Sequence, residues 1–251
     1  MHTPFNDRPI FGAAVPQAPS PSIEGVTTNY GRHITQAAHV NQMVKDMTLE
    51  QIVGSVRSPG YPDRVGNYQY TASGGIFFSC DPRVEEIHIE DIASALSRIP
   101  RFGGNTKKFL SVAEHCWICS NNVPPEHRLA ALLHDAAEAY IGDLIRPIKY
   151  LPVFGSVYLK IEAGIERKVA EKFGLAWPWS AEVRKVDERV VSVEIRDNIG
   201  SKVVNHLTDD IASRDEGTKS EDIFLYNWSP ELAKQFFLHR FKELTKQRYA
   251  R

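Results

Sequence analysis

Three residues able to hold a metal ion or move a proton lie within one apolar stretch, LAALLHDAAEAY. His134 and Asp135 are adjacent, and Glu138 follows within one helical turn. If the stretch is helical, residues three and four positions apart share a face. Burying such a face costs free energy unless its polar groups have partners. A metal ion would be such a partner, provided that other parts of the chain supply further ligands.

Two further candidates flank this stretch. His115 precedes it in FLSVAEHCWIC, and Asp187 follows it in EVRKVDERVV, beside an inward helical face marked by Val183, Val186 and Val190. Together with the His-Asp pair they would make a site of two imidazoles and two carboxylates from three helices. This donor set suits one divalent transition metal such as Zn, Co, Mn or Ni, with positions left for water and substrate.

Helical periodicity that could position these residues begins near residue 87. It predicts helices over 87–99, 109–123, 125–142, 152–174, 180–203 and 229–251, with Ser229 as the N-cap of the last. A short helix is expected over 39–56, where Thr48 and Gln51 form a potential capping box. GGIFFS (74–79) has the pattern of a short strand. Residues 1–40 are rich in Pro, Gly, Ser and Thr and are expected to form an extended arm that adds little to the core.

Bulk composition is ordinary for a soluble globular protein. The chain has 251 residues, 42% hydrophobic and 24% charged, with a formal net charge of -1. This balance gives no electrostatic reason to expect a polymeric nucleic acid or a membrane as partner. No apolar run is long enough to span a bilayer, and the N-terminus lacks a signal-peptide pattern, so we expect a cytoplasmic protein.

Three cysteines, Cys80, Cys116 and Cys119, are too few for a disulfide framework. Cys116 and Cys119 form a C-x-x-C directly after His115, a spacing found in zinc and redox sites. A four-cysteine zinc site needs a second such pair, which the sequence lacks. We therefore interpret both residues as small side chains that pack a helix.

The pattern His115, His134-Asp135, Asp187 resembles the H…HD…D signature of the HD-domain metal-dependent phosphohydrolases. FLSVAEHCWIC and ALLHDAAEAYIGDLIRPIK are similar to the corresponding helices of the bacterial 5'-deoxynucleotidase branch. IEDIASALSRIPRFGGNTKKFLSVAEH looks like the lead-in of phage and prophage members that act as deoxynucleotide triphosphohydrolases, some of them dATP-directed. The resemblance covers about residues 87–198 and implies a mainly α HD-domain helical bundle over 61–251, preceded by an irregular extension over 1–60 that carries at most a small β element.

The resemblance also implies functional roles. It assigns catalysis to Glu138, one turn after the metal ligands, and substrate binding to Arg101, Phe102, Asp143 and Lys149. Guanidinium and ammonium groups suit phosphate oxygens. Members with two metals insert extra histidines between the HD pair and the last Asp; residues 136–186 contain none, which predicts one ion.

The predicted function is hydrolysis of deoxynucleoside phosphates, either of monophosphates or of triphosphates to nucleoside and triphosphate, in control of the nucleotide pool. Relatives form dimers or hexamers, so a homo-oligomer is expected, in the host cytoplasm if the chain is phage-encoded. The alternative is a non-catalytic nucleotide-binding regulatory module in which the metal only braces the helices.

Overall fold

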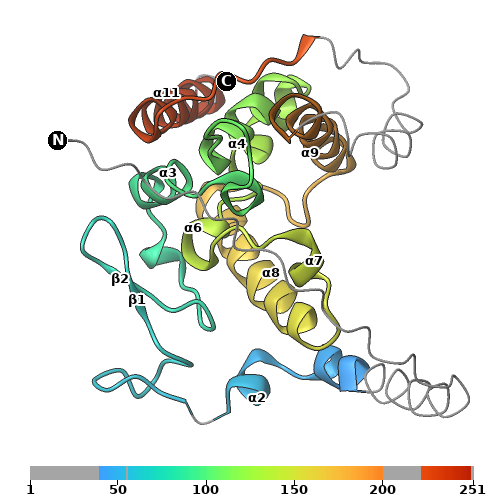
Figure 1. Ribbon diagram of the computed structural model, residues 1–251. Coiled ribbons are helices and arrows are strands. Elements are labelled where there is room, and N and C mark those ends of the chain that lie inside the picture. Colours follow the sequence, from blue (N-terminus) through green and yellow to red (C-terminus); the bar gives the residue numbers. More distant parts are fainter. Residues whose placement is uncertain (1–39, 55, 200–221, 250–251) are drawn as a thin grey trace, which may run out of the picture.

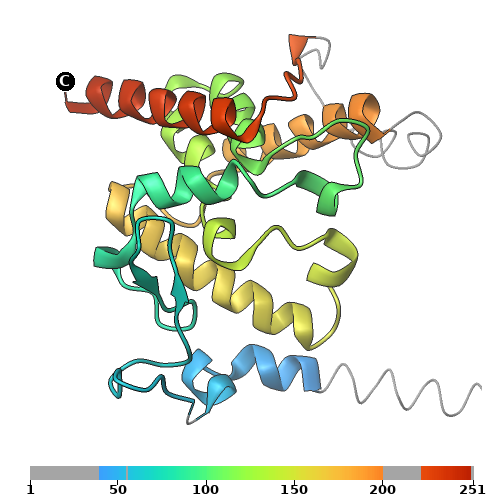
Figure 2. The same cartoon turned by 60° about the vertical axis from the view of Figure 1, so that its left-hand side comes forward.

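The computed structural model describes residues 40–54, 56–199 and 222–249, and this part of the chain is mainly α-helical (Figure 1). In both views, α9 and α11 lie at one end and α2 at the other, with α8 running between them (Figures 1 and 2). The elements are α2 (Leu49–Val53), β1 (Gln69–Tyr70), β2 (Ile76–Phe77), η1 (Val84–Glu86), α3 (Ile89–Leu96), η2 (Arg101–Gly104), α4 (Val112–Asn121), η3 (Pro125–His127), α5 (Arg128–Leu133), α6 (Glu138–Ile141), α7 (Arg146–Lys149), α8 (Phe154–Phe173), α9 (Ala181–Glu194), the π-helical turn η4 (Ile195–Ile199) and α11 (Pro230–Tyr249).

The helix expected over 39–56 is divided in two. Residues 40–46 are helical, and α2 then starts after Thr48, whose capping box with Gln51 is confirmed. The first piece docks on α8, where Asn41 Oδ1 accepts a hydrogen bond from the Val153 N–H at 3.0 Å and Lys160 Nζ donates to the Lys45 carbonyl at 2.7 Å. Residues 40–54 belong to the expected N-terminal extension, and these contacts show that they pack on the helical body. Residues 1–39 lie outside the described ranges.

The predicted strand in GGIFFS is confirmed as β2. It pairs antiparallel with β1, with Phe77 opposite Gln69. This β element lies after residue 60, so it belongs to the main part of the chain rather than to the N-terminal extension. Phe77 is fully buried and its ring stacks on Tyr140, with centroids 3.7 Å apart, which fixes the hairpin on α6.

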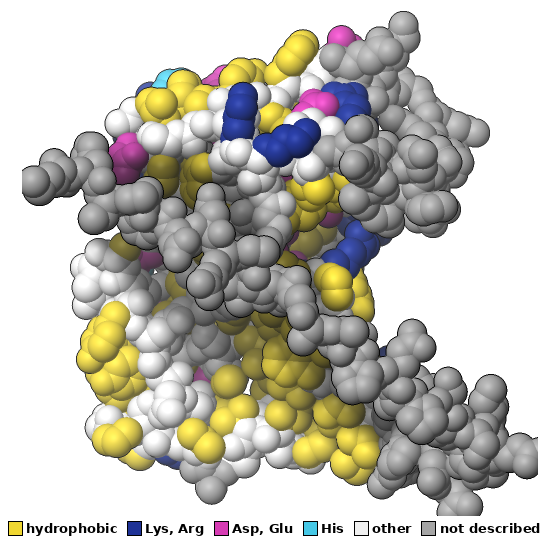
Figure 3. All heavy atoms as spheres, in the orientation of Figure 1, with side chains coloured by type: hydrophobic (Ala, Val, Ile, Leu, Met, Phe, Trp, Pro, Cys, Tyr) yellow, Lys and Arg dark blue, Asp and Glu magenta, His cyan; other side chains and the backbone are white. Residues whose placement is uncertain are grey.

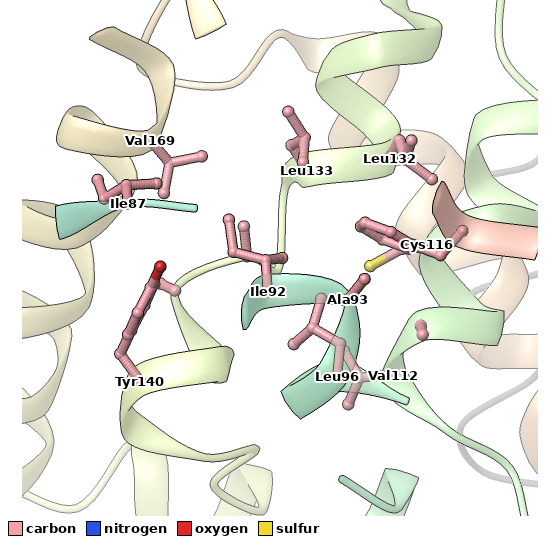
Figure 4. Close-up of a cluster of buried hydrophobic side chains, with 14 of the residues drawn as sticks. Ile87, Ile92, Ala93, Leu96, Val112, Cys116, Leu132, Leu133, Tyr140 and Val169 are labelled. Carbon is pink, nitrogen blue, oxygen red and sulfur yellow. The ribbon is translucent and has the colours of Figure 1, made fainter. Parts of the chain in front are cut away.

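Two clusters of buried hydrophobic side chains flank α4. The larger one joins β2, α3, α4, α5, α8 and α11 (Figure 4), and it includes Ile92, Leu96, Val112, Cys116 and Leu132. The smaller one joins α4 to α9, and it includes Ile118, Cys119, Val183, Val186 and Val190. Each Val, Leu, Ile or Phe side chain fully buried in these clusters contributes about 1.5–3 kcal/mol. Because α4 supplies residues to both clusters, its position between them is fixed.

Most helical predictions are confirmed, including the Ser229 N-cap of α11, whose Oγ accepts from Leu232 N at 3.4 Å, and the Gly174 C-cap of α8 in the left-handed conformation. The single helix expected over 125–142 is wrong. That stretch consists of η3, α5, a turn over 134–137 and α6. The last part of the helix expected over 180–203 lies outside the described residues.

One close approach requires glycine. A Cβ on Gly155, near the start of α8, would collide with the carbonyl oxygen of Lys149 in α7. This contact sets the path of the chain between α7 and α8. Within the described ranges, no helix combines the length and the apolar character needed to cross a membrane.

We predict that Phe77→Ala lowers the free energy of unfolding by about 3–5 kcal/mol, because it leaves a cavity against Tyr140. Tyr70→Ala is the matched control, since Tyr70 lies on the paired strand with its side chain 77% exposed; a change within about 0.5 kcal/mol is expected there. Urea unfolding followed by circular dichroism measures both. Equal effects of the two substitutions would show that the hairpin is not fixed through Phe77.

Candidate metal centre

Side chains from α4, α9 and the turn between α5 and α6 meet at one point. His115 lies on α4, His134 and Asp135 on the turn, and Asp187 on α9. Asp187 Oδ1 is 3.1 Å from His115 Nε2 and 3.8 Å from His134 Nε2. Asp135 Oδ2 is 3.6 Å and 3.4 Å from the same two nitrogens. The structure thus brings together the four residues that sequence analysis proposed as ligands.

The turn that carries His134 and Asp135 is tighter than an α-helix. Its backbone hydrogen bonds join residues three apart: Glu138 N donates to Asp135 O, and Tyr140 N to Ala137 O, each at 3.0 Å. A short 3₁₀ stretch within a helical segment often marks a functional hinge or a sequence under strain. This turn interrupts the α-helical hydrogen bonding between α5 and α6, so the single helix expected over 125–142 does not form.

Each imidazole is oriented through its Nδ1 atom. His134 Nδ1 is 2.9 Å from the carbonyl oxygen of Ala131, and since a carbonyl only accepts, Nδ1 carries the proton. His115 Nδ1 is 2.8 Å from Oε1 of the fully buried Glu194. A carboxylate or carbonyl on Nδ1 is the usual partner of a metal-binding histidine, because it fixes the tautomer and leaves Nε2 for the ion.

These residues fit a divalent metal ion. His134 Nε2 is buried and has no hydrogen-bond partner among the described residues, which is costly unless a ligand satisfies it. Two donors that bind one tetrahedral zinc ion lie about 3.4 Å apart, close to the four separations above. Buried groups of His, Cys and Asp side chains therefore lie close enough to hold a metal ion. Although burial raises the pKa of Asp187, its contacts with the two imidazoles hold that pKa well below its usual value.

Arg101 lies at the edge of this cluster and is buried. Its Nη2 and Nε donate to Glu194 Oε2 at 3.1 and 3.3 Å. Its Nη1 lies 3.8 Å from Asp135 Oδ2 and 3.7 Å from Asp143 Oδ2. Burial acts to lower the pKa of Arg101, but Glu194 and Asp135 raise it well above the usual value, so the guanidinium stays charged. The predicted substrate-binding arginine thus lies beside the candidate metal ligands. Glu194 fixes one edge of its guanidinium, and Nη1 faces Asp135 and Asp143.

Phe102 follows Arg101 in a left-handed conformation, with φ 55° and ψ 30°. This costs a non-glycine residue about 1–2 kcal/mol, and such strain is typical of functional sites. The turn is closed by a hydrogen bond from Arg101 N to Leu110 O at 2.9 Å. The strained residue therefore belongs to the loop that holds the arginine in place, and its ring centroid lies 5.6 Å from the guanidinium carbon.

Glu138 is the first residue of α6 and is 4% exposed; its Oε2 has no hydrogen-bond partner among the described residues. Burial raises the pKa of Glu138 well above its usual value, and the charges of Asp135 and Asp143 add to the shift. Asp143 is close to Arg101, and burial raises its pKa as well. Lys149, on α7, pairs with Glu162 at 2.8 Å, so that carboxylate already compensates part of its charge.

Glu194 and Glu114, two of the buried carboxylates that sequence analysis did not identify, contact this region. Glu194 lies seven residues after Asp187, two helical turns along the inward face of α9, and this spacing was the available signal. Glu114 precedes His115 and accepts three backbone N–H groups at 2.7–2.8 Å, from Tyr226, Asn227 and Trp228. No sequence signal marked Glu114, because its partners lie more than a hundred residues away.

The fold and the site define a mainly α protein with a candidate metal centre of histidine and carboxylate side chains. No protein-family model matches the chain. The uncharacterized protein YfdR of Escherichia coli (strain K12) is 39% identical over 127 residues, which are 51% of this chain and 70% of YfdR. The uncharacterized protein RCAP_rcc00048 of Rhodobacter capsulatus is 32% identical over 138 residues, 51% of this chain and 69% of that protein. The chain belongs to the same family as these two proteins.

We predict about one divalent ion per chain after purification without chelator. Its removal should lower the melting temperature, because ligands on α4, α9 and the α5–α6 turn couple binding to folding. The expected stabilisation is roughly 2.7 kcal/mol at a free-ion concentration one hundred times Kd. Elemental analysis and thermal unfolding with and without chelator measure this. Two ions per chain would contradict the predicted stoichiometry. A melting temperature that chelator does not change would contradict the coupling of ion binding to folding.

We predict that Glu194→Gln weakens metal binding by about 10–100-fold while leaving all four candidate ligands in place, because it removes the carboxylate that orients His115. Glu188→Gln, the same substitution at an exposed position of α9, is the control and should bind normally. Competitive zinc titration gives the affinities, and circular dichroism verifies folding. A folded Glu194→Gln protein with unchanged affinity would rule out this positioning role.

Proposed function

We propose that the chain is a metal-dependent phosphohydrolase of the HD-domain class that acts on deoxynucleoside phosphates. The observation that carries the proposal is the convergence of His115, His134, Asp135 and Asp187. These four residues match the signature on which the sequence resemblance rests, and they come from separate segments of the chain. Their convergence supports one mononuclear centre of Zn, Co, Mn or Ni.

The residues around the centre suit phosphate chemistry. A divalent ion held there supplies Lewis acidity toward a phosphoryl oxygen and an attacking water. Arg101 Nη1, on the side of Asp135 and Asp143, is placed to donate to a phosphate oxygen, while Glu194 fixes the opposite edge of the guanidinium. Lys149 adds positive charge that acts on Glu138 and is shared with Glu162.

Hydrolysis requires a proton for the departing oxygen. Glu138 is suited to hold that proton, because its buried Oε2 has no hydrogen-bond partner in the described part of the chain and its pKa is raised. Phe102, half-buried beside the guanidinium, is positioned by its strained turn to contact the sugar or base. Monophosphates and triphosphates both fit these residues, and the phage-like lead-in before His115 favours triphosphates, with dATP as the first to try.

The proposal extends to setting and assembly. A deoxynucleotide hydrolase works where its substrates are, so we place the protein in the cytoplasm. On the coloured part of the face in Figure 3, Lys and Arg side chains form small groups rather than one continuous basic surface, which agrees with a small substrate rather than a polymeric nucleic acid. Exposed hydrophobic side chains around α7 offer a surface for a homo-oligomer: Ile145, Ile148, Tyr150, Leu151 and Phe154.

The test is to incubate metal-loaded protein with a panel of deoxynucleoside mono- and triphosphates and to measure released phosphate and triphosphate. We expect turnover of at least one substrate, abolished by chelator and by Asp135→Ala, which removes a ligand. Glu138→Gln should keep the metal and lower kcat by about 10²–10⁴, the usual range for a positioned acid or base.

Glu126→Gln is the control for this test, because Glu126 is an exposed carboxylate in η3 and is not among the residues of the centre. Nucleotide binding without turnover across the whole panel would instead favour the non-catalytic regulatory module. Full activity in Glu138→Gln would remove that residue from the mechanism, and loss of its metal would make it a ligand.

A further inference from the structure

The Cys119 thiol lies beside the proposed metal centre. Its Sγ is 3.6 Å from Nε2 of His115, the nitrogen that faces Asp187, and Cys119 is fully buried. Cys119 and His115 are four residues apart on α4, so they lie on one face of that helix. The sequence favoured a packing role for this residue, and its burial in the cluster between α4 and α9 agrees with that role.

The separations around Cys119 also match a shared metal ion. A nitrogen and a sulfur bound to one tetrahedral zinc ion lie about 3.6 Å apart, given bond lengths of roughly 2.0–2.1 and 2.3 Å. One donor atom each from His115, Cys119 and His134 lie within 4.8 Å of one another. His134 Nε2, buried and without a hydrogen-bond partner among the described residues, is the independent sign that this space takes a ligand.

Cys116 is the weaker candidate of the two thiols. It also lies within 4.8 Å of donors on His134 and Asp135. However, its side chain lies among Ile92 and Ala93 in the larger hydrophobic cluster (Figure 4). Cys119 lies instead in the cluster between α4 and α9, and its sulfur is 3.6 Å from His115 Nε2, a separation that matches ligation to one ion.

We infer that Cys119 is a further ligand of the centre, which therefore prefers thiophilic ions such as Zn²⁺, Co²⁺ and Cd²⁺ over Mn²⁺ and Mg²⁺. The inference rests on the metal centre of the proposed function. The thiol would bind the ion as a thiolate, releasing its proton to solvent.

The test is to load the full-length, metal-free protein with Co²⁺ and record its absorption spectrum. Thiolate ligation gives a sulfur-to-cobalt charge-transfer band in the near ultraviolet, in addition to the weaker visible bands of the ion itself. We expect this band in the unaltered protein and its loss in Cys119→Ser. The preference for Zn²⁺ over Mn²⁺, measured by competition, should fall by about tenfold or more in that variant.

Cys116→Ser, a matched buried thiol on the same helix, and Cys80→Ser, on another part of the fold, should both retain the band. X-ray absorption of the unaltered zinc-loaded protein serves if Cys119→Ser does not fold: a sulfur neighbour at about 2.3 Å supports the inference. Stoichiometric Co²⁺ binding with no charge-transfer band and only nitrogen and oxygen neighbours overturns the inference and leaves the proposed function standing. Failure to bind any divalent ion overturns both.

Discussion

The carboxylate of Glu194 is the group on which the rest of the centre depends. It is fully buried, and isolating such a charge from water costs several kcal/mol unless partners compensate it. One of its oxygens faces His115 Nδ1 and the other accepts a hydrogen bond from Arg101. Moving either partner away would leave the buried carboxylate uncompensated. This one residue therefore joins α9, α4 and the η2 loop into a fixed arrangement.

The same bonds prepare the centre for a cation. With Glu194 on Nδ1, the His115 ring presents Nε2 to Asp187, and with Glu194 on one edge, Arg101 presents Nη1 to Asp135. Asp135, Asp143 and Asp187 then outnumber this guanidinium, and a divalent ion bound among them would offset the excess negative charge. Because hydrophobic clusters lie on both sides of α4, the interactions act in a medium of low dielectric constant, where they are stronger than in water.

Local signals explain which parts of this arrangement could be predicted from the sequence. Helical periodicity, the Ser229 N-cap of α11 and the Gly174 C-cap of α8 predicted the helices, because each of these signals depends on residues within one or two turns. His134 and Asp135 were identified because a His-Asp pair within an apolar run is a local anomaly, and His115 and Asp187 because they complete the H…HD…D pattern. Glu114 and Glu194 were missed because their meaning depends on partners that are distant in sequence, such as the backbone of Tyr226. The bonds that orient His115 and Arg101 join residues 79 and 93 positions apart, and helical periodicity carries no signal for them.

The tight turn at 134–137 shows how a local departure from the expected helix serves the site. In an α-helix, the side chain nearest in line with Glu138 is that of His134, four residues before it. In a 3₁₀ segment, residues three apart eclipse, which brings Glu138 over Asp135 instead. That alignment agrees with the role of the Asp135 charge in raising the pKa of Glu138. The two residues between them are alanines, buried at 0% and 1% exposure, whose small side chains allow the tightened backbone to pack against the core. The Ala-Ala pair in HDAAE therefore allows the chain to place Glu138 one tight turn after Asp135, a candidate metal ligand.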